Sequence, residues 1–179
     1  MAIEYLEHDE LYRDALVRAL DGARSSLWIA TANVKQTLVE RPGRRRFVPV
    51  VNVLGDLASR GIDVRLLHSG RPSGPFMESL RKSMALESPT FGMRRCPRVH
   101  FKAIIVDGSA AYSGSANLTG AGLGAKSPER RNFEVGIWSD DGKIVERLKD
   151  LFMAVWGGAF CDECGQRENC ASPLAGPEV

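Results

Sequence analysis

The order of apolar and polar residues predicts alternating helices and strands. Within Asp9–Arg24, apolar residues recur every three to four positions, which is typical of an amphipathic helix. The short apolar run Ser26–Ala32 predicts a buried strand. A second helix is expected at about Val48–Arg60, ending at Gly61, a residue suited to a helix C-cap. Asp63–His68 then predicts another strand.

The remaining elements are shorter, and irregular segments separate them. Residues 35–47 are polar and rich in Arg, Pro and Gly, so they predict a loop, and an irregular segment is expected up to Arg98. The expected elements of the second half are a loop over 69–75, a short helix around Met77–Met84, strands at Val99–Val106, Ala110–Ser113 and Phe133–Trp138, and a helix over Gly142–Trp156. The first two of these strands form a hairpin through Asp107-Gly108.

Alternation of helices and strands with an inserted hairpin predicts an α/β layered fold, in which helices flank a central mixed sheet. A chain of 179 residues is long enough to bury one substantial core. We expect one catalytic domain over 1–160 and a cysteine-bearing tail over 161–179 that packs near Cys96.

Composition is ordinary for a globular protein, and the net charge is only +2, so charge alone identifies no partner. The arginines are nevertheless clustered. They form three groups, at Arg41, Arg44, Arg45 and Arg46, at Arg94, Arg95 and Arg98, and at Arg130 and Arg131. Each group by itself is compatible with a solvated basic loop, but three groups around one motif favour a polyanionic substrate.

The first residues and the length of the apolar runs bear on the cellular location of the protein. The first residues lack a basic stretch followed by an apolar one, so no secretory signal is expected. No apolar run approaches the roughly 20 residues that span a bilayer. We therefore expect a cytoplasmic protein, in which structural disulfides are disfavoured.

The most informative segment is His100-x-Lys102-x4-Asp107-x6-Gly114-Ser115-x-Asn117. His100 and Lys102 are two residues apart, so on a strand they would point to the same face, with Ala103 and Ile105 on the other. A lysine that holds a phosphate oxygen beside a histidine that attacks phosphorus suits a phosphodiester substrate. This chemistry requires no metal ion.

The segment resembles the signature of the phospholipase D superfamily, and Asn132 and Glu134 match the strand that follows that motif in the family. The resemblance implies a two-step reaction through a phosphohistidine. In it, His100 is the nucleophile, Lys102, Ser115, Asn117 and Asn132 bind the phosphoryl group, and Glu134 holds the histidine ring. Asp107 belongs to the motif but lies at the exit of the strand, where an architectural role is favoured over proton transfer.

The family's reaction also needs a second histidine, which protonates the leaving oxygen. This chain has one copy of the motif, and His8 and His68 lack the Lys and Gly-Ser context. The resemblance therefore implies a homodimer whose two copies of His100 share one active site.

Four cysteines lie outside the family pattern. Cys161, Cys164 and Cys170 have the spacing Cys-x2-Cys-x5-Cys, and Cys96 lies four residues before His100. Four thiolates are a complete ligand set for a 4Fe–4S cluster or for structural zinc. The spacing resembles the cluster loops of endonuclease III-like glycosylases, so we expect a structural 4Fe–4S cluster. Zinc and metal-free thiols are the alternatives.

Three functions are compatible with these features. The first is a metal-independent nuclease that cuts DNA or RNA. The second is a phospholipase or phosphatidyl transferase, although such family members usually carry two motifs in one chain. The third is a non-catalytic module that binds nucleic acid or senses redox state. The intact motif and the arginine groups favour the nuclease.

Overall fold

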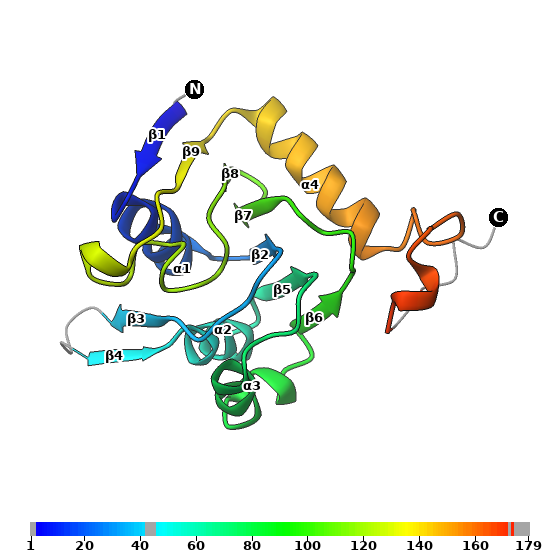
Figure 1. The fold of residues 1–179 in the computed structure, drawn as a ribbon, viewed down its shortest axis with the longest axis horizontal. Coiled ribbons are helices and arrows are strands. Elements are labelled where there is room, and N and C mark those ends of the chain that lie inside the picture. Colours follow the sequence, from blue (N-terminus) through cyan, green and yellow to red (C-terminus); the bar gives the residue numbers. More distant parts are fainter. Residues whose placement is uncertain (1–2, 42–45, 172, 174–179) are drawn as a thin grey trace.

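A seven-stranded mixed sheet forms the centre of the computed structural model, which describes residues 3–41, 46–171 and 173 (Figure 1). The strand order is β1-β9-β8-β7-β2-β5-β6. The strands are β1 (Ile3–Glu7), β2 (Ser26–Thr31), β5 (Asp63–His68), β6 (Phe91–Arg95), β7 (Lys102–Val106), β8 (Ala110–Gly114) and β9 (Val135–Ser139). β2, β5 and β6 are parallel, whereas every pairing among β2, β7, β8, β9 and β1 is antiparallel.

Helices cover both faces of this sheet. The larger core cluster contains side chains of the π-helical segment Leu11–Val17, α1 (Arg18–Gly22), α2 (Val50–Ser59) and α3 (Gly74–Arg81). On the other face, Phe152 of α4 packs in a second cluster, where its ring stacks on that of Trp28. Figure 1 shows the long α4 (Gly142–Trp156) on the side of the sheet opposite α1 and α2. The α/β layered fold with a mixed central sheet is therefore confirmed.

Most of the expected elements form at the expected positions. α4 has the predicted bounds, and α2 ends before Gly61, whose positive φ of 86° suits the left-handed cap. The β7–β8 hairpin turns through Asp107 and Gly108, with φ of 52° and 61°. A positive φ at both positions is what a tight hairpin turn requires, and Asp and Gly adopt it more readily than other residues do.

Four strands appear where none was expected. β1 and β6 are the two edges of the sheet, and the predicted loop over 35–47 contains most of a separate hairpin of β3 (Leu38–Arg41) and β4 (Arg46–Pro49). All five residues of β6 are partly exposed, so its sequence lacks the apolar run of a buried strand. Pairing with β5 makes it a strand, and this pairing is a tertiary effect.

Two short helical segments lie in the connections between these elements. Met84–Glu87 follows α3, and Pro128–Arg130 lies in the connection to β9. A third single turn, Arg167–Asn169, lies in the tail. Within the described part of the chain, no helix is long and apolar enough to cross a membrane.

The close approach of β8 and β9 yields a stability prediction. A Cβ added to Gly136 would lie 2.3 Å from the ring of Tyr112, which is 1% exposed and has no room to move. We expect Gly136→Ala to lower the free energy of unfolding by about 1–3 kcal/mol. Gly142→Ala is the control, because nothing lies within 4 Å of its added Cβ. Urea denaturation measures both, and equal stability of the two variants would contradict this packing.

Candidate active site

His100 and Lys102 lie together where β7 begins. The Lys102 ammonium donates a hydrogen bond to the His100 carbonyl oxygen at 2.6 Å, and its Nζ lies 3.3 Å from Nδ1 of the imidazole. Lys102 is 9% exposed, whereas the His100 side chain is open to solvent. The pair therefore presents a buried, fixed cation beside an accessible ring nitrogen, which suits an anionic substrate.

The strand that carries this pair is shorter than expected. β7 starts at Lys102 rather than at Val99, and His100 lies in the irregular stretch between the strand and a preceding turn, in which the Val99 amide donates to the Cys96 carbonyl oxygen. All five residues of β7 are buried, so the face of the strand that carries Lys102 is covered by the core and does not face open solvent. The pairing of Lys102 and His100 thus comes from the turn and not from strand alternation alone.

Asn117 is held by the end of β2. Its Oδ1 accepts hydrogen bonds from the amides of Ala32 and Asn33 at 3.1 and 3.0 Å, and from the Thr31 hydroxyl at 3.2 Å. These three donors fix the side chain with its oxygen inward, which leaves the amide NH2 group to donate to a ligand. Sequence analysis missed Thr31, although its place at the carboxyl end of a parallel strand marks it as a ligand-site position.

Ser115, Asn132 and Glu134 form one hydrogen-bonded group. Glu134 accepts from the Ser115 hydroxyl through Oε2, and from the Asn132 amide through Oε1 at 3.0 Å. Ser115 follows Gly114, which pairs with Lys102, so this group lies beside the start of β7. Among the described residues, no hydrogen bond joins Glu134 to His100, so the ring-orienting role of Glu134 stays a prediction.

A polar pocket of about 250 Å³ contains two of the predicted substrate-binding residues, Asn117 and Asn132. Its other lining residues are Asn33, Lys35, Gln36, Thr119, Gly120, Ala121 and Lys126. Two ammonium groups and four side-chain amides surround a space that no described carboxylate lines. Sequence analysis missed Lys35 and Lys126, because neither lies in the motif or in an arginine group.

The other two histidines have different surroundings. His68, at the end of β5, is 4% exposed, and its Nδ1 lies 2.9 Å from the Gly70 carbonyl oxygen. Burial lowers the pKa of His68, because the buried ring is costly to protonate. His8 lies at the surface, and its nearest charged group is the Glu7 carboxylate at 3.7 Å.

Asp107 lies at the end of β7, away from Lys102. Its carboxylate accepts hydrogen bonds from the backbone amides of Arg24, Ser25 and Ser26 and from the Ser25 hydroxyl, at 2.8–3.1 Å. Burial alone would raise the pKa of Asp107, but the hydrogen bonds outweigh it and lower that pKa below its usual value. The carboxylate thereby joins the β7–β8 turn to the start of β2.

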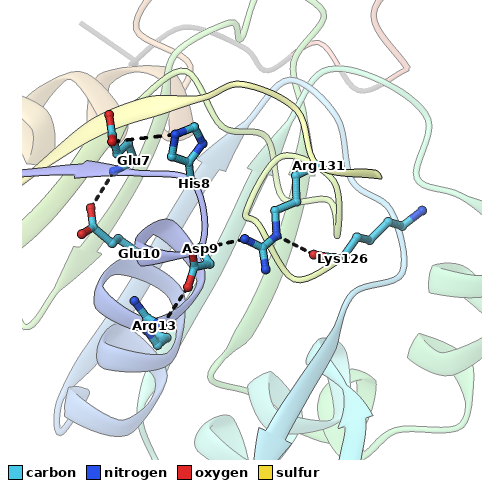
Figure 2. Close-up of polar contacts among 7 residues, drawn as sticks. All are labelled: Glu7, His8, Asp9, Glu10, Arg13, Lys126 and Arg131. Carbon is cyan, nitrogen blue, oxygen red and sulfur yellow. Dashed lines mark hydrogen bonds and ion pairs between the residues drawn. The ribbon is translucent and has the colours of Figure 1, made fainter. Parts of the chain in front are cut away.

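Arg131 holds a loop in place. Figure 2 shows its guanidinium between Asp9 and the backbone of Lys126, with hydrogen bonds of 3.2 Å to Asp9 and 2.6 Å to the Lys126 carbonyl oxygen. Arg131 therefore stabilises the loop that carries Asn132, whereas the side chain of its neighbour Arg130 is exposed. Of the first arginine group, Arg44 and Arg45 and the side chains of Arg41 and Arg46 lie outside what the structure describes.

All four cysteines are unpaired as disulfides, and they line one pocket of about 300 Å³. Cys96 directly follows β6, and Cys161, Cys164 and Cys170 belong to the tail after α4. Within the described residues, no group of three or more His, Cys, Asp or Glu side chains is arranged to hold a metal ion. The structure thus gathers the predicted ligands around one pocket without forming a closed coordination site.

Comparison with known sequences matches most of the chain to one family. The family described as "Cardiolipin synthase, PLD-like domain" matches residues 16–156. Two curated proteins named cardiolipin synthase, from Listeria welshimeri and Listeria innocua, are each 28% identical over 114 residues. That match covers 60% of this chain but only 22% of each relative, so the chain spans about a fifth of their length.

Solved structures share the fold over most of this chain. NucT from Helicobacter pylori superposes with a TM-score of 0.63 at 19% identity, covering 87% of this chain and 95% of its own. Nuc from Salmonella typhimurium, described as a phospholipase D family member, has a TM-score of 0.62 at 20% identity and covers 93% of its own chain. TrmBL2, described as an archaeal chromatin protein with a novel mode of DNA binding, has a TM-score of 0.58 at 12% identity, over 87% of this chain and 52% of its own.

The contacts of Asp107 predict an effect on stability that depends on pH. Because its folded pKa is lowered, the carboxylate stabilises the fold above its unfolded pKa of about 4 and loses this effect as pH falls through the folded value. We expect Asp107→Asn to lower the free energy of unfolding by about 1–3 kcal/mol at pH 7 and to reduce the loss on acidification. Asp150→Asn, an exposed change on α4, is the control for denaturation at pH 7 and pH 3. An unchanged acid dependence in Asp107→Asn would refute this role.

Proposed function

The chain belongs to the family of PLD-like domains that is described for cardiolipin synthase, and we propose that it is a metal-independent phosphodiesterase that cleaves nucleic acid. The observation that supports phosphodiester chemistry is the contact between buried Lys102 and accessible His100. The observation that favours nucleic acid is the polar pocket that Asn117 and Asn132 of the same candidate site line.

The reaction proceeds in two displacements at phosphorus. The His100 imidazole attacks the phosphodiester, a phosphorus–nitrogen bond forms, and the bond to the leaving oxygen breaks as a second histidine donates a proton to that oxygen. Water then attacks the phosphohistidine while the second histidine accepts its proton, which releases a phosphomonoester and restores His100. Lys102 and Asn117 bind the non-bridging oxygens and stabilise the charge that develops on them.

The pocket that Asn117 and Asn132 line fits a nucleotide better than an acyl chain. Lys35 and Lys126 provide ammonium groups for phosphates, and Asn33, Asn117 and Asn132 provide amides for polar base or sugar edges. An acyl chain in the pocket would remove these polar groups from water without offering them hydrogen-bond partners, which is costly. When Lys102 binds one phosphate of a polynucleotide, the neighbouring phosphate or base would occupy this pocket.

The second histidine comes, in this proposal, from a second copy of the chain. Lys102 has one histidine beside it, and His68 is buried on the Gly70 carbonyl. Phe133 is 95% exposed between Asn132 and Glu134, and Ile3, Tyr5 and Val135 of the neighbouring strands β1 and β9 are also largely exposed. An apolar surface next to the site supports a two-fold interface there, because it would bring two copies of His100 toward each other.

The same exposed Phe133 favours one alternative function. An exposed aromatic ring beside a phosphodiester site could insert into a lipid surface, and the matching family is described for cardiolipin synthase. A phosphatidyl transferase would use the same His100 and Lys102 with an alcohol in place of water. The polar pocket argues against it, and the substrate comparison below separates the two.

We predict that His100→Ala abolishes cleavage in the presence of EDTA. Losing the nucleophile and, in the dimer, the general acid removes two roles that are each worth at least ~10²-fold in rate. Labelled single- and double-stranded DNA, RNA and phosphatidylglycerol vesicles are incubated with the wild type, with His100→Ala, and with His8→Ala as the control. Activity of His100→Ala near that of wild type would refute the assignment, as would a requirement for Mg²⁺. Turnover of the vesicles alone would establish the lipid function instead.

We predict that Phe133→Glu converts a dimer into a monomer and lowers cleavage at least ~10-fold, because a charge placed at the centre of an interface is strongly unfavourable. Phe47→Glu is the control, since Phe47 is 58% exposed on β4, outside the main sheet. Light scattering at micromolar concentration and cleavage assays are performed on both variants. A wild-type protein that is monomeric and fully active would contradict the shared site.

A further inference from the structure

The pocket between the turn before His100 and the tail has an unusual lining. Its residues fall into three groups: all four cysteines of the chain, four arginines (Arg94, Arg95, Arg98 and Arg167), and a largely apolar remainder (Pro97, Val99, Phe101, Leu151, Val155, Phe160 and Pro173). The cysteines come from two segments that are far apart in the sequence. Side chains brought together in this way by the tertiary fold indicate a common ligand.

We propose that Cys96, Cys161, Cys164 and Cys170 bind one 4Fe–4S cluster in this pocket as its four thiolate ligands. Four cysteines complete the coordination of such a cluster, with one thiolate for each iron. Zinc also accepts four thiolates, but its cysteines usually come as two close pairs, and only Cys161 and Cys164 form one here. The pocket of about 300 Å³ is roughly ten times the ~30 Å³ of one water molecule, so it has room for a polynuclear centre.

The charges around the pocket also favour an anionic occupant. Four thiolates around a centre of charge about +2 leave a net charge of about −2, which burial among neutral groups would penalise. The four arginines offset that charge, and no described carboxylate lines the pocket. Arg98 already lies 3.8 Å from the Cys164 sulfur, and Arg167 lies 3.9 Å from the Asp162 carboxylate.

Closing the site around a cluster requires the tail to rearrange. The sulfurs are not arranged around a common point, but between Cys161 and Cys170 the described backbone consists of successive single turns. Such turns, including the one over Arg167–Asn169, can readjust without breaking a strand or a long helix. Cys96 is the fixed ligand, because its amide donates to the His68 carbonyl oxygen at 2.8 Å.

The cluster would stabilise the approach to the active site. The Cys96 carbonyl oxygen accepts a hydrogen bond from the Val99 amide in the turn just before His100, so a cluster on Cys96 would link this turn to the tail. This consequence rests on the proposed function, whereas binding of the cluster does not. Loss of the cluster should reduce cleavage by loosening the turn, without removing any chemical step.

The experiment measures iron, acid-labile sulfide and zinc in the full chain purified without oxygen, together with its visible absorption. We expect about four iron and four sulfide atoms per chain and a broad thiolate-to-iron absorption band. Cys96→Ser and Cys170→Ser should each lose at least half of the iron, whereas Glu163→Ser, an exposed change in the same tail, should retain it. Circular dichroism verifies that each variant is folded.

Each outcome supports or overturns the cluster separately from the proposed function. One zinc per chain without iron would overturn the 4Fe–4S assignment. A metal-free wild type with four titratable thiols would overturn the metal site altogether, and this result needs no variant. His100→Ala should keep its iron while losing cleavage, so a failure of the phosphodiesterase proposal leaves the metal measurement intact.

Discussion

The position of β7 between β2 and β8 is the constraint on which the rest of the structure depends. β7 is buried on both faces and is antiparallel to both neighbours, so its first residue lies beside the carboxyl end of β2 and the end of β8. This arrangement places Lys102 next to the strand ends that position Asn117 and Ser115. At the opposite end, Asp107 fixes the same strand to the backbone of Arg24–Ser26. The motif is therefore one strand that is held at both of its ends.

The candidate site is pre-organised mainly by hydrogen bonds from side chains to backbone. Asn117 is oriented by the end of β2, and Glu134 is engaged by Ser115 and Asn132. Close packing adds a further constraint, since a Cβ on Gly114 would lie only 2.4 Å from the Tyr112 hydroxyl. Burial raises the pKa of that hydroxyl to about 12, so it remains neutral while it accepts the Ala116 amide. A fixed site of this kind supports catalysis by positioning and charge stabilisation.

Two surfaces next to the site suit different kinds of partner. The Lys- and Asn-lined pocket is suited to a polar, anionic chain, whereas exposed Phe133 is suited to burial by another surface. The pocket with the four cysteines lies on the other side of the turn before His100 and has its own arginines. His100 thus lies near three different surfaces. In these proposals a substrate would occupy the polar pocket, a second protomer would cover Phe133, and a metal centre would bind in the cysteine pocket.

The sequence by itself determined the main elements and the chemical residues, because helical periodicity, Gly61, the Asp107-Gly108 turn and the spacing of the motif are local signals. It also identified His100, Lys102 and Asn117 as a group, since they lie near one strand. Only the tertiary structure decided that β1 and β6 are strands, because an edge strand forms by pairing and carries little pattern of its own. The tertiary structure also placed Thr31, Lys35 and Lys126 near the site and assigned Arg131 to Asp9. Contacts between segments far apart in the sequence leave no mark in the local order of residues. The number and spacing of the four cysteines predicted that they lie together, but the pocket that they line and the arginines around it are features of the tertiary fold.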